Sequence, residues 1–227
     1  MTVAMNYNDV KARMEAACVR AGRNPKDVTL IAVSKTKPVS MLQEAYEAGA
    51  RTFGENKVQE IVEKYPQMPS DAKFHMIGHL QTNKVGQVIE KAVLIHSVDS
   101  VHLAEKIEKE AAKRNMVAEI LLEVNVARED SKFGLYMEDV VSVLESIQKF
   151  PHVCVKGLMT IAPYVENAED NRKYFKDLYQ LYVDIKSKNL DNGTMSVLSM
   201  GMTGDYEVAV EEGATMIRVG TGIFGSR

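Results

Sequence analysis

Two groups of residues in this sequence have types and positions suited to chemistry, and the first is a lysine at the end of an apolar run. Lys35 ends the segment LIAVSK, which has the length and composition of a β-strand. Because side chains alternate along a strand, Lys35 faces the same side as Ile31 and Val33. An amine on that side is desolvated, which lowers its pKa and makes it a nucleophile towards carbonyl groups. A lysine that reaches from a strand end into water is the structural alternative, and we assign the neighbouring Lys37 to solvent.

The second group is a run of glycines near the C-terminus. Residues 220–225 read GTGIFG and match the dinucleotide-binding pattern G-x-G-x-x-G. That pattern needs a following helix and a long βαβ unit, which we do not expect in a sequence that stops at Arg227. Glycines after a strand instead expose backbone N–H groups to a phosphate, with hydroxyl donors available from Ser199, Thr203 and Thr221. A simple terminal turn is the alternative.

A nucleophilic lysine that faces a phosphate-binding loop suits a ligand with both a carbonyl group and a phosphate. Pyridoxal phosphate has both groups, and so does the sugar phosphate substrate of a Schiff-base aldolase. These residues alone do not separate the two ligands.

Other residues at strand ends give weaker signals. His75 and His79 lie around one predicted strand end, but no third metal ligand is near them in the sequence. We therefore expect no metal site. Asp99 and Glu123 are acids at the predicted barrel mouth, and we expect structural roles for both.

Short strands and amphipathic helices alternate along the chain and must position these residues. Eight apolar, β-branched runs predict strands at 28–34, 51–53, 74–77, 93–98, 119–126, 153–161, 195–199 and 215–219. Strict alternation makes the strands parallel, and eight such units favour an α/β fold with a single closed (β/α)8 barrel of the TIM type. An extra helix at residues 7–22 precedes the first strand. A doubly wound open sheet is the competing architecture.

Composition narrows the class of protein. The 227 residues fit one domain, 1–227, and the 45% hydrophobic and 26% charged fractions are those of a globular protein. A net charge of -3 gives no reason to expect nucleic acid or an anionic membrane as partner. We find no signal peptide and no apolar run long enough to span a membrane. Cys18 and Cys154 form no disulfide or metal pattern, so we expect a cytoplasmic protein.

Six segments, in order along the chain, resemble the pyridoxal phosphate homeostasis protein family. They are AVSKTKP (32–38), FGENKVQE (53–60), FHMIGHLQTNK (74–84), NVAREDSKFG (125–134), GLMTIAP (157–163) and SMGMTGDYEVAVEEGATMIRVGTGIFG (199–225). The resemblance implies a barrel similar to the N-terminal domain of bacterial alanine racemase. It also implies that Lys35 holds pyridoxal 5′-phosphate (PLP) as a Schiff base. The sequence departs from the family at Lys73, where tryptophan is usual, and at Thr203, where serine is common.

The same resemblance implies roles for further residues. Arg218 would face the pyridine nitrogen, Asn56 would lie near the ring or the imine, and Lys132 could meet incoming cofactor. The phosphate would be surrounded by Ser199, Met200, Gly220, Thr221 and Gly222. The expected cofactor-binding set is therefore Lys35, Asn56, Ser199, Met200, Arg218, Gly220, Thr221 and Gly222, with no catalytic residue.

An arginine at the pyridine nitrogen has a functional consequence. A guanidinium only donates hydrogen bonds, so it leaves the nitrogen unprotonated and the ring a weaker electron sink. Racemases of this architecture take an opposing tyrosine base from a second β-domain, which this sequence lacks, and none of its nine tyrosines has an obvious corresponding place. We expect a monomeric PLP carrier in intracellular PLP homeostasis, without robust turnover, whose recipients are PLP-dependent apoenzymes. A low-activity amino-acid racemase and a Schiff-base aldolase are the alternatives.

Overall fold

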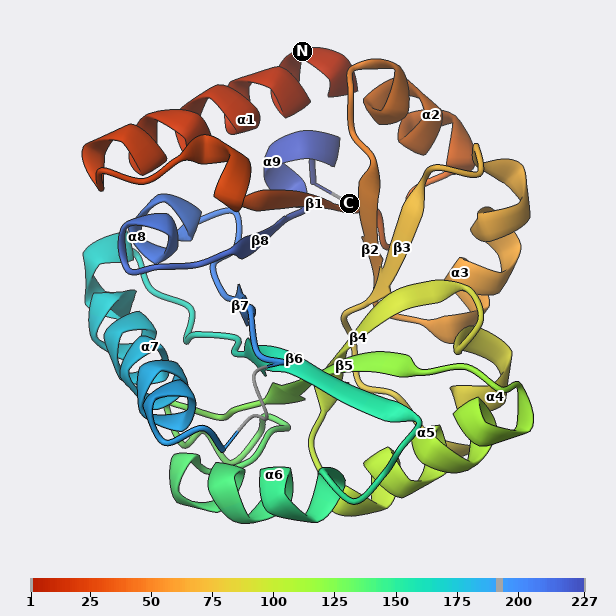
Figure 1. The fold of residues 1–227 in the computed structure, drawn as a ribbon. Helices are drawn as coiled ribbons and strands as arrows, with labels where there is room; N and C mark the ends of the chain where they lie inside the picture. Colours follow the sequence, from red (N-terminus) through yellow and green to blue (C-terminus); the bar gives the residue numbers. More distant parts are fainter. Residues whose placement is uncertain (1, 191–193, 227) are drawn as a thin grey trace.

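Eight parallel strands close into a barrel in the computed structural model, which describes residues 2–190 and 194–226 (Figure 1). Each strand pairs with the next one in the chain, and β8 closes the ring against β1. The predicted barrel is confirmed and the open sheet is wrong, because a doubly wound sheet would leave two unpaired edges. The strands are β1 (Thr29–Val33), β2 (Thr52–Glu55), β3 (Lys73–Met76), β4 (Ala92–Val98), β5 (Ala118–Glu123), β6 (Val153–Met159), β7 (Val197–Ser199) and β8 (Met216–Val219).

Helices between the strands surround the barrel (Figure 1). The predicted N-terminal helix is present as α1, where the Thr2 hydroxyl accepts a hydrogen bond from the Met5 N–H and caps the first turn. Among the described residues, no helix combines the length and apolarity needed to cross a bilayer. The helices are α1 (Val3–Arg20), α2 (Val39–Glu47), α3 (Val58–Lys64), α4 (Val85–Val88), α5 (Val101–Lys113), α6 (Val140–Ile147), α7 (Arg172–Ser187), α8 (Tyr206–Glu211) and α9 (Thr221–Phe224).

Strand register determines which side chains enter the barrel. Ile31 lies opposite Arg218 across the β1–β8 pair, so the two side chains point to the same side of the sheet. Two small apolar clusters, separate from the core beneath the helices, fill part of that interior with residues such as Ile31 and Leu121. Polar side chains are also buried in the strands, including those of His75, His96 and Arg218. The barrel interior is therefore partly polar.

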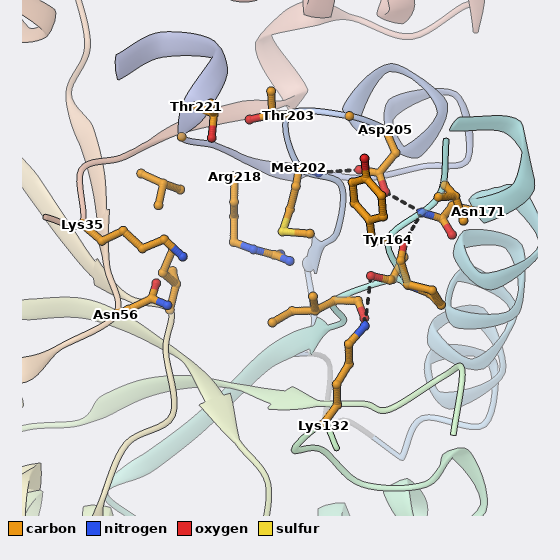
Figure 2. Close-up of a pocket in the computed structure, with 18 of the residues that line it drawn as sticks. Lys35, Asn56, Lys132, Tyr164, Asn171, Met202, Thr203, Asp205, Arg218 and Thr221 are labelled. Carbon is orange, nitrogen blue, oxygen red and sulfur yellow. Dashed lines mark hydrogen bonds between the residues drawn. The ribbon is translucent and has the colours of Figure 1, made fainter. Parts of the chain in front are cut away.

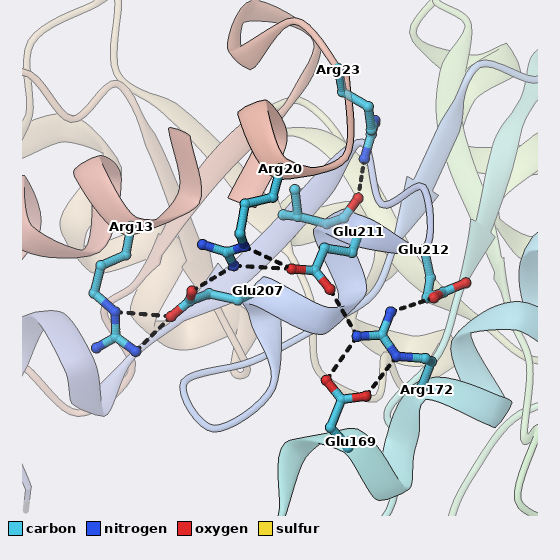
Figure 3. A network of polar contacts seen from close by, with 9 residues as sticks. Arg13, Arg20, Arg23, Glu169, Arg172, Glu207, Glu211 and Glu212 are labelled. Atoms are coloured by element: carbon cyan, nitrogen blue, oxygen red, sulfur yellow. Dashed lines mark hydrogen bonds and ion pairs between the residues drawn. The ribbon is translucent and has the colours of Figure 1, made fainter. Parts of the chain in front are cut away.

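Ion pairs attach α1 to the last part of the barrel (Figure 3). Arg13 and Arg20 of α1 pair with Glu207 of α8 at 2.6 and 2.9 Å. Glu211 of α8 joins Arg20, at 3.0 Å, to Arg172 at the start of α7, at 2.8 Å. This network links α1, near the start of the chain, to α7 and α8, near its end, and holds the extra helix beside α8.

Candidate cofactor-binding site

A cavity of about 610 Å³ opens among the loops that follow the strands (Figure 2). These loops lie at the C-terminal ends of parallel strands, where barrel enzymes hold their ligands. Five of the eight predicted cofactor-binding residues line it: Lys35, Asn56, Arg218, Gly220 and Thr221. Barrel closure thus brings the N-terminal lysine and the C-terminal glycines to one site.

Lys35 follows β1 and is half-buried in the wall of the cavity. Figure 2 shows the side chains of Lys35, Asn56 and Arg218 extending into the same part of the cavity. Asn56 follows β2 and packs directly on Gly78, where a Cβ atom would lie only 2.5 Å from the Asn56 carbonyl oxygen. A glycine at position 78 therefore allows the end of β3 to approach the residue beside Lys35.

Arg218 is buried, with 4% of its surface exposed, and its guanidinium is held by two partners. It donates to the Ser199 hydroxyl at 2.5 Å and to the Thr160 carbonyl at 2.7 Å. Behind Ser199 the contacts continue to His96 Nδ1 at 3.0 Å, and from His96 Nε2 to His75 Nδ1 at 2.8 Å. The guanidinium donates to Ser199, whereas the donor and acceptor in the Ser199–His96 and His96–His75 contacts depend on the imidazole tautomers. This chain fixes the orientation of Arg218.

Burial determines the charges around this chain. Desolvation lowers the pKa of Arg218 to about 10, so the side chain remains cationic near neutral pH. Desolvation also lowers the pKa of His75 to about 3 and that of His96 well below its ordinary range, so both imidazoles are neutral. Burial, with a contribution from Asp99, raises the pKa of Glu123 to about 7. Arg218 is therefore the principal fixed positive charge of the barrel interior described here.

The other three predicted cofactor contacts have structural partners. Ser199 is fully buried, and its hydroxyl bonds Arg218 and His96. The Met200 side chain packs in the core while its N–H donates to the Met216 carbonyl at 3.1 Å. The Gly222 N–H donates to the Thr203 hydroxyl at 3.3 Å, and a Cβ atom at this glycine would lie 3.2 Å from Thr203. These three residues are not among those that line the cavity.

Two further lysines reach the cavity, and the assignment of Lys37 to solvent is wrong. Its ammonium donates to the carbonyls of Gly225 and Ser226 at 3.1 and 3.0 Å, because the C-terminal segment folds back over the loop after β1. Lys132 donates to the Ala162 carbonyl at 3.2 Å and pairs with Glu129. Both ammonium groups therefore have hydrogen-bond acceptors at the edge of the cavity.

Two of the strand-end residues, His79 and Asp99, lie beside each other. His79 stacks on Phe133 with ring centroids 3.9 Å apart, and its Nδ1 lies 3.4 Å from a carboxylate oxygen of Asp99. No cluster of three side chains able to hold a metal ion occurs in residues 2–190 and 194–226.

Sequence reasoning missed several residues of the cavity and its surroundings. His96 lies inside a continuous apolar strand pattern, AVLIHSV, and gave no signal by itself. Tyr164 and Asn171 line the cavity from positions outside the quoted motifs, and Asp205 lines it from within the 199–225 motif without having been singled out. Asp205 accepts hydrogen bonds from Asn171 and from the Met202 N–H, which ties the loop after β7 to the start of α7.

Comparison with known proteins identifies the family. The model of the family described as alanine racemase, N-terminal domain, matches residues 6–227. A pyridoxal phosphate homeostasis protein from Aquifex aeolicus is 44% identical over 228 residues, which cover 100% of this chain and 99% of that protein.

Solved structures give the same result. The structure of PipY from Synechococcus elongatus with PLP bound superposes with a TM-score of 0.81 and 35% identity, covering 94% of this chain and 100% of PipY. An alanine racemase from Clostridium difficile, 14% identical, has a TM-score of 0.75 over 57% of its own length and shares the fold. The chain therefore belongs to the alanine racemase N-terminal domain family, among the pyridoxal phosphate homeostasis proteins.

Proposed function

We propose that this protein binds PLP through a Schiff base on Lys35 and serves intracellular PLP homeostasis as a carrier, without robust catalytic turnover. The observation that carries the proposal is the cavity that brings together Lys35, Arg218 and the Gly220–Thr221 turn. Its support outside this chain is the PLP-bound PipY structure and the relative from Aquifex aeolicus. PLP supplies an aldehyde that condenses reversibly with amines, which suits a carrier because the cofactor can be transferred by exchange.

The donors around the cavity fit the three parts of this cofactor. Lys35 supplies the amine. Gly220 is the N-cap of α9 and Thr221 its first residue, and the first N–H groups of a helix lack carbonyl partners within it, so they suit a phosphate. Arg218 supplies a permanent donor for the pyridine nitrogen.

The weak turnover that we propose follows from Arg218 as well. The Arg218 guanidinium donates a hydrogen bond to the pyridine nitrogen but does not transfer a proton to it, and an unprotonated pyridine ring withdraws electrons poorly. The chain from Ser199 through His96 to His75 fixes the guanidinium, and both imidazoles are neutral, so these residues provide no alternative acid.

A low-activity amino-acid racemase is the second candidate function, because one tyrosine lies where the sequence indicated none. Tyr164 lines the same cavity, but its side chain is 95% exposed. A side chain in bulk water is neither desolvated nor held in place, as an efficient base must be. Exchange of the α-hydrogen of alanine in D2O tests this candidate. Brisk exchange that Tyr164→Phe abolishes would favour the racemase over the carrier.

We further propose that residues 1–227 form a single PLP-binding domain. It acts as a monomer in the cytoplasm and transfers PLP to apoenzymes. The family match over residues 6–227 supports the single domain. Free thiols at both Cys18 and Cys154 agree with a reducing compartment.

Borohydride reduction followed by mass mapping of peptides tests the central claim. Protein reconstituted with PLP should carry the reduced adduct on Lys35, and Lys35→Ala should lose it while it retains weakly bound cofactor. Lys37→Ala and Lys132→Ala are matched controls, because both lysines line the same cavity and donate to carbonyls. An adduct on Lys37 or Lys132, or no adduct in the unmodified protein, would contradict the proposal.

A further inference from the structure

Three charged side chains lie against the loop that carries Lys35. Lys64 ends α3, and its ammonium donates to the Ser34 carbonyl at 2.9 Å, to Glu55 at 2.9 Å and to Glu60 at 2.7 Å. Glu60 in turn accepts a hydrogen bond from the Thr36 N–H at 2.7 Å. Glu55, at the end of β2, accepts a hydrogen bond from the Ser34 hydroxyl at 2.6 Å.

These contacts reach the backbone on both sides of Lys35. The cluster holds the carbonyl of Ser34, the residue before it, and the N–H of Thr36, the residue after it. Thr36 has a φ of 63°, a left-handed conformation that a β-branched residue rarely adopts and that surrounding contacts must maintain. The lysine backbone is thus fixed at its two neighbours by groups from another strand and another helix.

The cluster is buried to an extent that is unusual for ionic groups. The exposed fraction is 5% for Lys64 and 0% for Glu55, and one Glu55 oxygen has no hydrogen-bond partner. Desolvation of such a pair offsets much of its attraction, so a well-packed apolar pair would serve stability equally well. Buried ionic groups can instead specify one geometry. Here the geometry that they specify is that of the loop at Lys35.

We propose that Glu55, Glu60 and Lys64 are positioning residues that hold the Lys35 amine in the orientation needed for bond formation with an aldehyde. This inference rests on the proposed function. In that step the lysine nitrogen forms a double bond to the aldehyde carbon, and the aldehyde oxygen leaves as water with the two amine protons. The three side chains act through the backbone of Ser34 and Thr36 and do not themselves react.

Glu60→Ala is the decisive variant. Glu60 is only half-buried and lies on α3, where alanine is a good helix former, so the barrel should still fold. The substitution removes the acceptor of the Thr36 N–H and one partner of Lys64. Glu63→Ala is the matched control, since it removes the same charge from an exposed position of the same helix.

Two ligands distinguish a loss of Lys35 positioning from a general loss of cofactor binding. PLP with borohydride trapping reports the equilibrium between bound cofactor and the Schiff base on Lys35. Pyridoxine 5′-phosphate has the same ring and phosphate but an alcohol in place of the aldehyde, so it reports binding without bond formation.

We expect Glu60→Ala to lower the fraction trapped on Lys35 by about tenfold at subsaturating PLP, as loss of one charge-assisted hydrogen bond predicts. Its affinity for pyridoxine 5′-phosphate should remain within about twofold of wild type, a change of less than about 0.5 kcal/mol. Glu60→Gln keeps an oxygen for the Thr36 N–H and should recover most of the trapping. Glu63→Ala should match wild type in both assays.

Two results would overturn this inference in different ways. If wild type traps PLP on Lys35 and Glu60→Ala traps it equally well, or loses both ligands in parallel, the cluster has no positioning role. If wild type itself gives no Lys35 adduct, the proposed function fails and the inference fails with it.

Discussion

Replacing Glu123 by glutamine should change how the stability of this protein depends on pH. Glu123 ends β5 with 7% of its surface exposed, and burial raises the pKa of its carboxyl from 4.5 to about 7. Between those values the folded protein binds more protons at this site than the unfolded chain. The contribution of this site to wild-type stability therefore decreases as pH rises from 4.5 to about 7, and the loss is complete above the folded pKa.

The size of the effect follows from that pKa difference. The interval from 4.5 to about 7, at about 1.36 kcal/mol per pH unit, corresponds to about 3 kcal/mol. The pKa of about 7 already includes the attraction of Arg218, which lowers it, and the repulsion of Asp99, which raises it. Glutamine has nearly the same shape and no charge at any pH. Glu123→Gln should thus resemble wild type near pH 4.5 and exceed it by up to about 3 kcal/mol near pH 8.

Urea denaturation across this pH range measures the difference directly. Glu119→Gln is the control, because Glu119 lies on the same strand with an exposed side chain. Its stability curve should run parallel to that of wild type. Parallel curves for wild type and Glu123→Gln would refute the reasoning, and so would a variant whose stability relative to wild type falls as pH rises.

Three further predictions concern stability and use the same urea assay. Ser199→Ala should lower the free energy of unfolding by about 1–3 kcal/mol, because it leaves Arg218 and His96 without a shared partner. Unchanged stability together with weakened phosphate binding would instead place this hydroxyl at the phosphate. Gly222→Ala should lower the free energy of unfolding by about 1–3 kcal/mol, since the added Cβ would lie 3.1 Å from the Val219 side chain. Gly204→Ala should lower it far less, because an added Cβ at Gly204 would have no atom within 4 Å. Glu211→Ala should lower the free energy of unfolding by about 1 kcal/mol at low salt, because it removes the ion pairs with Arg20 and Arg172. That difference should shrink in about 1 M NaCl, where the Debye length is about 3 Å, and a salt-independent difference would count against the ionic explanation.

The barrel was predictable because its signal is local and repeated. Each of the eight strands is an apolar run between polar helices, and each predicted run overlaps an observed strand. Strict alternation then leaves few topologies. The place of Lys35 at a strand end and of Gly220 and Thr221 after the last strand follows from the same pattern, so the sequence alone predicts that these residues meet at one mouth of the barrel.

What the sequence does not reveal is which side chains and carbonyls become hydrogen-bond partners. Lys37 was assigned to solvent because sequence gives no sign that residues 225–226 return to it. The Ser199 hydroxyl lies between Arg218 and His96, a pairing that the family motif around Ser199 does not reveal. His96 and Lys64 give no signal in the sequence, since a single polar residue in a strand or helix is uninformative until its neighbours in space are known.

The sequence by itself determined the closed ring of strands, the family, and the lysine and glycines that meet at its mouth. Only the tertiary structure decided that Arg218 is held by a chain of neutral histidines, and that Lys64 reaches 30 residues back to the Ser34 carbonyl. The physical reason is that hydrophobic periodicity encodes which face of an element is buried. Hydrogen bonds inside a closed barrel depend instead on strand register and on the packing of residues far apart along the chain.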